Sequence, residues 1–169
     1  MRKPRHLLNG AGYHVTARIN RQEFALQPPE IKELFIAVLR QSKTKFNFTL
    51  RNFVLMSTHI HLQITPGAKE NLSKIMQWIL SVFAIRFNKL MGYKGHVWYD
   101  RFKSSIIHNY RIFLQTFYYI ANNPVKAGLV KRPEDFAYSG VSFLIRGIYD
   151  IIHPPDLSIM VLPLKSTDS

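Results

Sequence analysis

The sequence predicts an α+β domain in which helices cover an antiparallel β-sheet. Short stretches alternate apolar and polar residues, and longer stretches repeat apolar residues at the helical period. The two kinds follow one another as strand, helix, strand, strand, helix, strand. That order is the ferredoxin-like βαββαβ pattern, with an antiparallel sheet and helices on one face. We expect extra C-terminal helices after the pattern.

The first strand and the first helix follow a basic arm over residues 1–11. Residues 13–19 alternate and are rich in β-formers, which predicts a strand with His14, Thr16 and Arg18 on its polar face. Pro28-Pro29-Glu30 then opens a helix. Its core-facing positions are Ile31, Leu34, Phe35, Val38 and Leu39.

The next two predicted strands are joined by a turn at Ser57-Thr58. Successive side chains of a strand point to opposite faces, so His59, His61 and Gln63 share one face of the second of these strands. The other face carries Ile60, Leu62 and Ile64 and is expected to meet the core. In the βαββαβ topology the first and third strands are central neighbours, so His14 is expected to approach His61.

The remaining elements are predicted from their periodicity and from residues that typically begin or end a helix. Residues 71–91 follow the helical period and end at Gly92, residues 104–108 form a short strand, and residues 110–122 form another helix. Asn123 as N-cap, Pro124 at the first helical position and Gly128 as stop predict a short second helix after a bend. We expect the main domain to span residues 1–140, with 141–169 a C-terminal extension packed on it and ending in a disordered tail.

Composition limits the classes of partner. Lys and Arg outnumber Asp and Glu by 23 to 10, giving a formal net charge of +13. Such an excess favours a polyanion, with nucleic acid ahead of a membrane surface because no basic amphipathic helix stands out. The absence of cysteine excludes disulfides and zinc–thiolate sites. No apolar run reaches the roughly 18 residues of a membrane helix, so we expect a cytoplasmic protein without a membrane partner.

The His-Ile-His triplet is the first candidate site. Its two imidazoles lie about 7 Å apart along a strand and can converge on one metal ion or one phosphate. The alternative is a pair of solvent-facing histidines on an ordinary amphipathic strand.

The helix over residues 110–122 supplies the second candidate group. Tyr119 and Asn123 are four residues apart and lie one above the other, as do Tyr118 and Asn122, so spacing alone does not choose between the pairs. A phenol with an ordinary pKa near 10 is mostly protonated at neutral pH, but a cation that polarises a phosphodiester makes it a competent nucleophile. The alternative roles are a core-edge aromatic and a helix cap.

The segment over residues 96–103 combines aromatic and basic side chains. Trp98 and Phe102 suit stacking on unpaired bases, and Arg101 and Lys103 suit contact with phosphates. The same composition suits a core edge with cations lying over rings.

Four sequence pieces together resemble one family. They are GYHVTAR at 12–18, VLMSTHIHL at 54–62, WYDRFKS at 98–104 and YIANNPVKAGLV at 119–130. In this order they resemble the single-tyrosine HUH transposases of the IS200/IS605 type, and most closely the REP-associated tyrosine transposases. The resemblance covers roughly residues 2–140. Ser57-Thr58 replaces the family's usual Pro-Asn, and Tyr99 stands where Gln is common.

The resemblance implies a metal-dependent nuclease and strand transferase for hairpin-containing single-stranded DNA. It implies that His59, His61 and Asn123 hold Mg²⁺ or Mn²⁺ and that Tyr119 is the nucleophile, forming a 5′-phosphotyrosine link. It also implies a bacterial, nucleoid-associated protein, and a homodimer is among the compatible assemblies. The candidate DNA contacts are Arg2, Lys3, Arg5, Arg18, Trp98, Arg101, Phe102, Lys103 and Lys126.

Two rival functions are compatible with the same residues. One is a domesticated DNA-hairpin-binding protein that keeps the scaffold and has lost catalysis. The other is a metal-dependent phosphodiesterase or RNA-processing enzyme that uses the two histidines with water.

Overall fold

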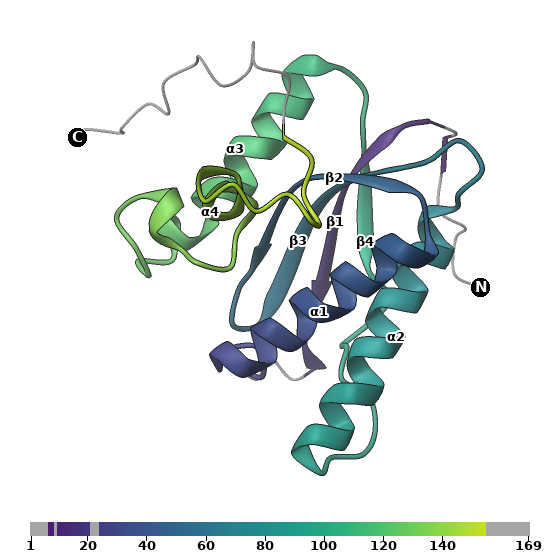
Figure 1. The fold of residues 1–169 in the computed structure, drawn as a ribbon, viewed down its shortest axis with the longest axis vertical. Coiled ribbons are helices and arrows are strands. Elements are labelled where there is room, and N and C mark those ends of the chain that lie inside the picture. Colours follow the sequence, from purple (N-terminus) through teal and green to yellow (C-terminus); the bar gives the residue numbers. More distant parts are fainter. Residues whose placement is uncertain (1–6, 9, 21–23, 155–169) are drawn as a thin grey trace.

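The computed structural model describes residues 7–8, 10–20 and 24–154 (Figure 1). The arm residues Arg2, Lys3 and Arg5 and the tail predicted to be disordered lie outside the described residues. The elements are, in chain order, β1 (Gly12–Arg18), α1 (Pro29–Lys45), β2 (Phe48–Leu55), β3 (His59–Pro66), α2 (Leu72–Met91), β4 (Lys103–Ile107), α3 (Tyr110–Lys126), the 3-10 turn η2 (Pro133–Asp135) and α4 (Gly140–Ile145).

The four strands form one antiparallel sheet in the order β2-β3-β1-β4. This arrangement confirms the predicted ferredoxin-like α+β fold, including the central position of the first and third strands. The register pairs Thr16 with His61 and Arg18 with His59. The polar faces of the two central strands therefore meet where the histidines lie.

One face of the sheet carries the main hydrophobic core, which α1 and α2 cover. Val15 on β1 and Leu62 on β3 are fully buried there with Phe35 of α1 and Phe83 of α2, whose rings are 5.1 Å apart. The helix α2 begins within one residue of the predicted position, at Leu72, and the Asn71 side chain caps it by accepting a hydrogen bond from the Lys74 N–H. It ends at Gly92 in the left-handed conformation, with φ of 67°.

The helix α3 packs on the opposite face, against β2 and β3 and beside β4 (Figure 1). Two buried amides fasten it: Asn52 of β2 donates to the Phe117 carbonyl at 2.9 Å, and Gln63 of β3 donates to the Phe113 carbonyl at 3.0 Å. The two carbonyls are one helical turn apart. The polar face of the sheet is thus covered, and the prediction's alternative of an ordinary solvent-facing strand does not describe it.

The predicted bend at Asn123 is wrong. The helix α3 continues through Pro124 to Lys126, and Gly128, with φ of 71°, follows its end. A proline has no backbone N–H, so the helix lacks one backbone hydrogen bond at Pro124. The side chains of Asn122 and Asn123 add donors here, to the carbonyls of Tyr118 and Tyr119.

Residues 139–154 return the chain to β2. Ile151 and Ile152 are buried in the main core, and the His153 N–H donates to the Leu50 carbonyl. A Cβ on Gly140 would lie 2.4 Å from Oδ1 of Asn52, so glycine is required where α4 begins. The return segment therefore packs directly on the residue that fastens α3. The predicted boundary at residue 140 stays a prediction.

Candidate functional site

Three histidine rings gather on the covered face of the sheet. His14 and His61 stack with centroids 5.1 Å apart, and His59 and His61 meet edge to face at 4.9 Å. The Nε2 atom of His14 lies 2.9 Å from Nδ1 of His61, and Oγ1 of Thr16 lies 3.2 Å from the same nitrogen. Thr58 makes the equivalent contact with Nδ1 of His59 at 2.9 Å. Alternation along β1 and β3 brings these groups to one face, as the sequence predicted for His14 and His61.

Burial keeps these imidazoles neutral. Desolvation, helped by the charges that His59 and His14 would carry, lowers the pKa of His61 from 6.5 to about 3. Burial also lowers the pKa of His14, and burial together with the Arg18 guanidinium lowers the pKa of His59. Near neutral pH each ring therefore keeps a lone pair, which a metal ligand requires.

Tyr119 is the tyrosine of α3 that faces the histidines. Its ring centroid lies 5.6 Å from His61 and 5.6 Å from His14, and the residue is 45% exposed. Tyr118 instead packs against the main core and meets Phe117 edge to face. Tyr118 is therefore directed away from the histidines, whereas Tyr119 is partly exposed to solvent beside them.

Asn123 lies one turn beyond Tyr119 on the same helix. Its side-chain NH₂ donates to the Tyr119 carbonyl at 3.0 Å, and its side chain also forms a hydrogen bond that raises the pKa of His59. The sheet and the helix thus meet at His59 and Asn123.

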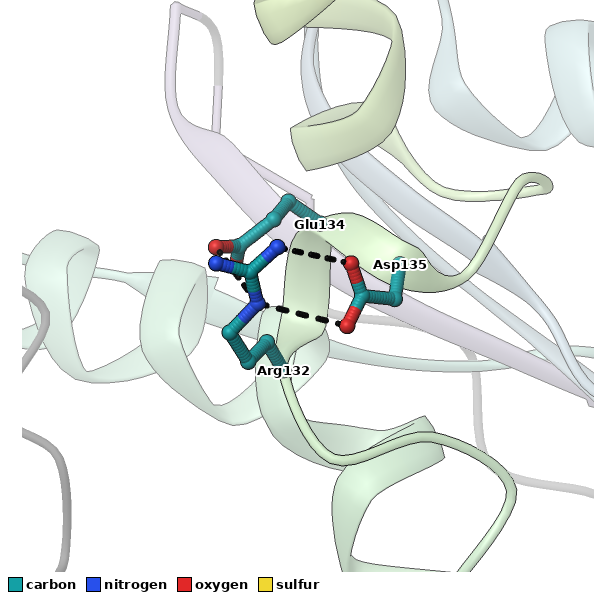
Figure 2. A network of polar contacts seen from close by, with 3 residues as sticks. All are labelled: Arg132, Glu134 and Asp135. Carbon is teal, nitrogen blue, oxygen red and sulfur yellow. Dashed lines mark hydrogen bonds and ion pairs between the residues drawn. The ribbon is translucent and has the colours of Figure 1, made fainter.

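Positive charge borders this group of side chains. Nζ of Lys126 lies 5.2 Å from the centroid of the Tyr119 ring, and the exposed Arg18 ends the strand beside His59. Arg101 and Lys103 are exposed near the opposite edge of β1. Arg132 differs, because its guanidinium contacts the carboxylates of both Glu134 and Asp135 (Figure 2).

The segment over residues 96–103 has its aromatic side chains divided between core and surface. Phe102 is 6% exposed, and Trp98 packs on Phe35 and Phe83 while its Nε1 donates to the Leu80 carbonyl. These positions match the core-edge alternative rather than base stacking. Tyr99 is 71% exposed, and its N–H donates to the Arg18 carbonyl. It lies on the border of a hollow of about 860 Å³ between α2 and this segment.

The residues present fit a divalent cation. Both Nδ1 atoms have polar partners, so an ion would meet Nε2 of each ring. At His59 the ion would displace the hydrogen bond with the Asn123 side chain, whose amide oxygen could then turn to the ion. Within residues 7–8, 10–20 and 24–154, no three His, Cys, Asp or Glu side chains come together in a way that could hold a metal. An ion site here would therefore depend on two histidines and an amide, with water completing the shell.

Comparison with known proteins identifies the family. The profile described as "Transposase IS200 like" matches residues 8–123, more than half of the chain. The chain belongs to the IS200-like transposase family. No curated protein sequence matches it.

Solved structures agree with this IS200-like fold. A REP-associated tyrosine transposase, solved bound to a REP hairpin, is 24% identical, with a TM-score of 0.72 and 92% of each chain covered. A protein of Deinococcus radiodurans R1 with a provisional transposase assignment is 16% identical, with a TM-score of 0.50, over 72% of this chain and 97% of that one. At these identities the likeness shows the fold.

Sequence reasoning gave His14 no role, although it placed His14 near His61. The sequence contained a signal for such a role, because Tyr-His-Val-Thr sets His14 and Thr16 on the polar face of a central strand.

None of the helices that the structure describes is long and apolar enough to cross a membrane.

Proposed function

We propose that this IS200-like family member is a metal-dependent endonuclease and strand transferase that acts on hairpin-containing single-stranded DNA. The observation that supports this function is that the ring of Tyr119, a partly exposed residue, lies with its centroid 5.6 Å from the ring centroids of His61 and His14. A phenol among neutral imidazoles, bordered by cations, suits attack on a phosphodiester. The similar fold solved with a REP hairpin supports the choice of DNA substrate.

The reaction is a transfer of one phosphodiester bond. The Tyr119 oxygen bonds to the scissile phosphorus, the bond from phosphorus to the 3′ oxygen breaks, and the leaving 3′ oxygen gains a proton as the phenol loses one. The product is a 5′-phosphotyrosine link and a 3′-hydroxyl. In the second step another 3′-hydroxyl attacks the link, and the phenol regains its proton. No oxidant, reductant or nucleotide cofactor is needed.

His59, His61 and Asn123 would hold Mg²⁺ or Mn²⁺. A divalent ion there supplies charge that polarises the scissile phosphate and stabilises its developing negative charge. The histidines hold their lone pairs because burial keeps them neutral. Asn123 donates to the Tyr119 carbonyl, and its side chain influences the pKa of His59, so it would link the nucleophile's helix to the ion site.

The DNA strand would lie along the cations that border the site. Arg18 and Lys126 are nearest to the histidines and the phenol, and Arg101 and Lys103 continue the positive surface. Among the aromatic residues of the segment over 96–103, Tyr99 is the one whose exposure suits base stacking. Trp98 and Phe102 would support the segment from the core.

The experiment is trapping of the covalent intermediate. The full chain is incubated with a labelled hairpin DNA carrying single-stranded flanks, in the presence of Mn²⁺, and an SDS-resistant adduct is sought. We expect an adduct in wild-type protein and in Tyr118→Phe, and none in Tyr119→Phe. Binding without an adduct in wild-type protein would support the domesticated DNA-binding rival. Cleavage that persists in Tyr119→Phe would support the water-using phosphodiesterase.

A further inference from the structure

The Nδ1 atom of His61 has two polar neighbours on the adjacent strand. Nε2 of His14 lies 2.9 Å away and Oγ1 of Thr16 lies 3.2 Å away. Thr16 is the register partner of His61, and His14 is two residues earlier on β1. The neighbouring rings of His14 and His61 stack at an interplanar angle of 28°.

A contact between two imidazole nitrogens contains one hydrogen, and its position decides what His61 can do. If His14 donates from Nε2, Nδ1 of His61 accepts, and a neutral His61 carries its proton on Nε2. If His61 donates from Nδ1, its Nε2 keeps a lone pair and can bind an ion. The hydrogen bond made by one ring nitrogen sets the state of the other.

We propose that His14 is a positioning residue that, together with Thr16, holds His61 in the Nδ1–H tautomer and leaves its Nε2 lone pair directed towards the ion site. The inference rests on the proposed function, because it concerns the ion that His59, His61 and Asn123 would hold. His14 acts through His61 and is not itself a ligand, since its Nε2 is occupied by the contact with Nδ1. In the described part of the chain it also joins no group of three metal-ligating side chains.

His14 also contacts the helix α3. Its ring lies 5.6 Å from the Tyr119 ring, at an interplanar angle of 66°. His14 therefore touches both the histidine that would bind the ion and the tyrosine that would attack. A purely structural role would need only the ring, and the positioning role needs the nitrogen acceptor as well.

The test separates the nitrogen from the ring by His14→Phe, which keeps an aromatic side chain and removes the acceptor. His108→Phe is the matched control, because His108 is exposed beyond the end of β4. His14→Gln restores an acceptor without the ring. The double variant His14→Phe/Thr16→Val removes both partners of Nδ1.

The first measurement is the tautomer of His61 in the metal-free full chain. Long-range proton–nitrogen correlation spectra of the ¹⁵N-labelled protein show which ring nitrogen carries the hydrogen. We expect Nδ1–H in the wild type, in His108→Phe and in His14→Gln, a growing Nε2–H population in His14→Phe, and mainly Nε2–H in the double variant. An Nε2–H tautomer of His61 in the wild type would overturn the inference without any variant having to fold.

The second measurement is Mn²⁺ affinity, followed by the electron paramagnetic resonance signal of unbound Mn²⁺. We expect His14→Phe to bind Mn²⁺ about 10- to 100-fold more weakly, the usual effect of removing a partner behind a metal ligand. His108→Phe should bind as the wild type does, and His14→Gln within a few-fold of it. Unchanged affinity in His14→Phe would overturn the inference. If wild-type protein bound no Mn²⁺, the proposed ion site would fail, and the tautomer spectra would still decide the role of His14.

Discussion

His61 is both a buried residue and a candidate metal ligand. It is 5% exposed, contacts His14, His59 and Tyr119, and stands on a central strand. A buried neutral imidazole costs little at neutral pH, whereas a buried charged one is expensive. The placement that keeps a lone pair available therefore makes the folded state sensitive to acid.

We expect the free energy of unfolding to fall as pH falls below about 6.5. The pKa of His61 is about 3 in the folded chain, against an ordinary value of 6.5, so the unfolded chain binds the extra proton between these values. That difference amounts to about 2 kcal/mol between pH 7 and pH 5. Urea unfolding at the two pH values measures it.

The variant His61→Gln should lose that part of the pH slope. His108→Gln, which changes an exposed histidine, should keep it. Equal slopes in the wild type and His61→Gln would show that His61 is not the group responsible. Such a result would also remove the argument that this ring is held neutral.

At the scale of elements, the site is formed by the docking of α3 on the sheet. Asn52 donates to the Phe117 carbonyl and accepts from the Phe53 N–H, and Gln63 donates to the Phe113 carbonyl. These bonds fix the rotation of α3 about its axis. Tyr119, two residues after Phe117, depends on that rotation to face the histidines.

We expect Asn52→Ala to destabilise the protein by about 1–3 kcal/mol, because two backbone groups lose a buried partner. Asn88→Ala is a matched control on α2, where the amide bonds to the exposed Gly95. Its cost should be below about 1 kcal/mol. Urea unfolding measures both.

Asn52→Ala should also reduce formation of the Tyr119 adduct under conditions in which the protein remains folded. Gln63→Leu should reduce it in the same direction, since it releases the preceding turn of α3. Normal adduct yield in a folded Asn52→Ala protein would show that the two amides hold the helix for stability alone.

The elements were predictable from sequence where local signals agree with tertiary packing. Alternation located β1 and β3, the helical period located α2, and Gly92 marked its end. The same local reading failed at Asn123-Pro124, which carries helix-start signals but lies inside α3. Packing of Ile120, Ala121 and Pro124 continues the buried side of that helix as far as the proline, and a local signal contains no such information.

The candidate site was predictable in its strand half. A period of two places His59 and His61 on one face whatever the rest of the chain does. Spacing alone could not choose Tyr119 over Tyr118, because that choice depends on how α3 rotates on Asn52 and Gln63. Nor could composition tell that Trp98 lies on the core and Tyr99 in solvent.

At the scale of the whole molecule, charge is the dominant property. The formal net charge is +13, and the cations nearest the candidate site are exposed. Binding of single-stranded nucleic acid releases counterions in proportion to the phosphates neutralised. Affinity for the proposed substrate should therefore fall steeply with salt.

We expect log affinity for a hairpin DNA with single-stranded flanks to fall linearly with log salt concentration. If Arg18, Arg101, Lys103 and Lys126 each neutralise one phosphate of a single strand, they contribute a slope of about −3. Lys126→Gln should make the slope shallower by about 0.7. Fluorescence anisotropy over a salt series measures it.

Arg132→Gln is the control for that experiment. Its guanidinium already contacts Glu134 and Asp135, so its loss should change the slope little (Figure 2). Equal effects of the two variants would mean that net charge alone, and not the cations bordering Tyr119, sets the salt dependence.

The unbroken course of α3 has one mechanical consequence. Because α3 is continuous through Asn123, the phenol of Tyr119 and the amide of Asn123 are carried by one helix, while the imidazoles are carried by the sheet. If α3 moved away from the sheet, Tyr119 and Asn123 would move together, and the two histidines would stay in place. The candidate site therefore consists of two parts, one on the helix and one on the sheet. The hydrogen bonds from Asn52 and Gln63 to α3 hold the two parts together.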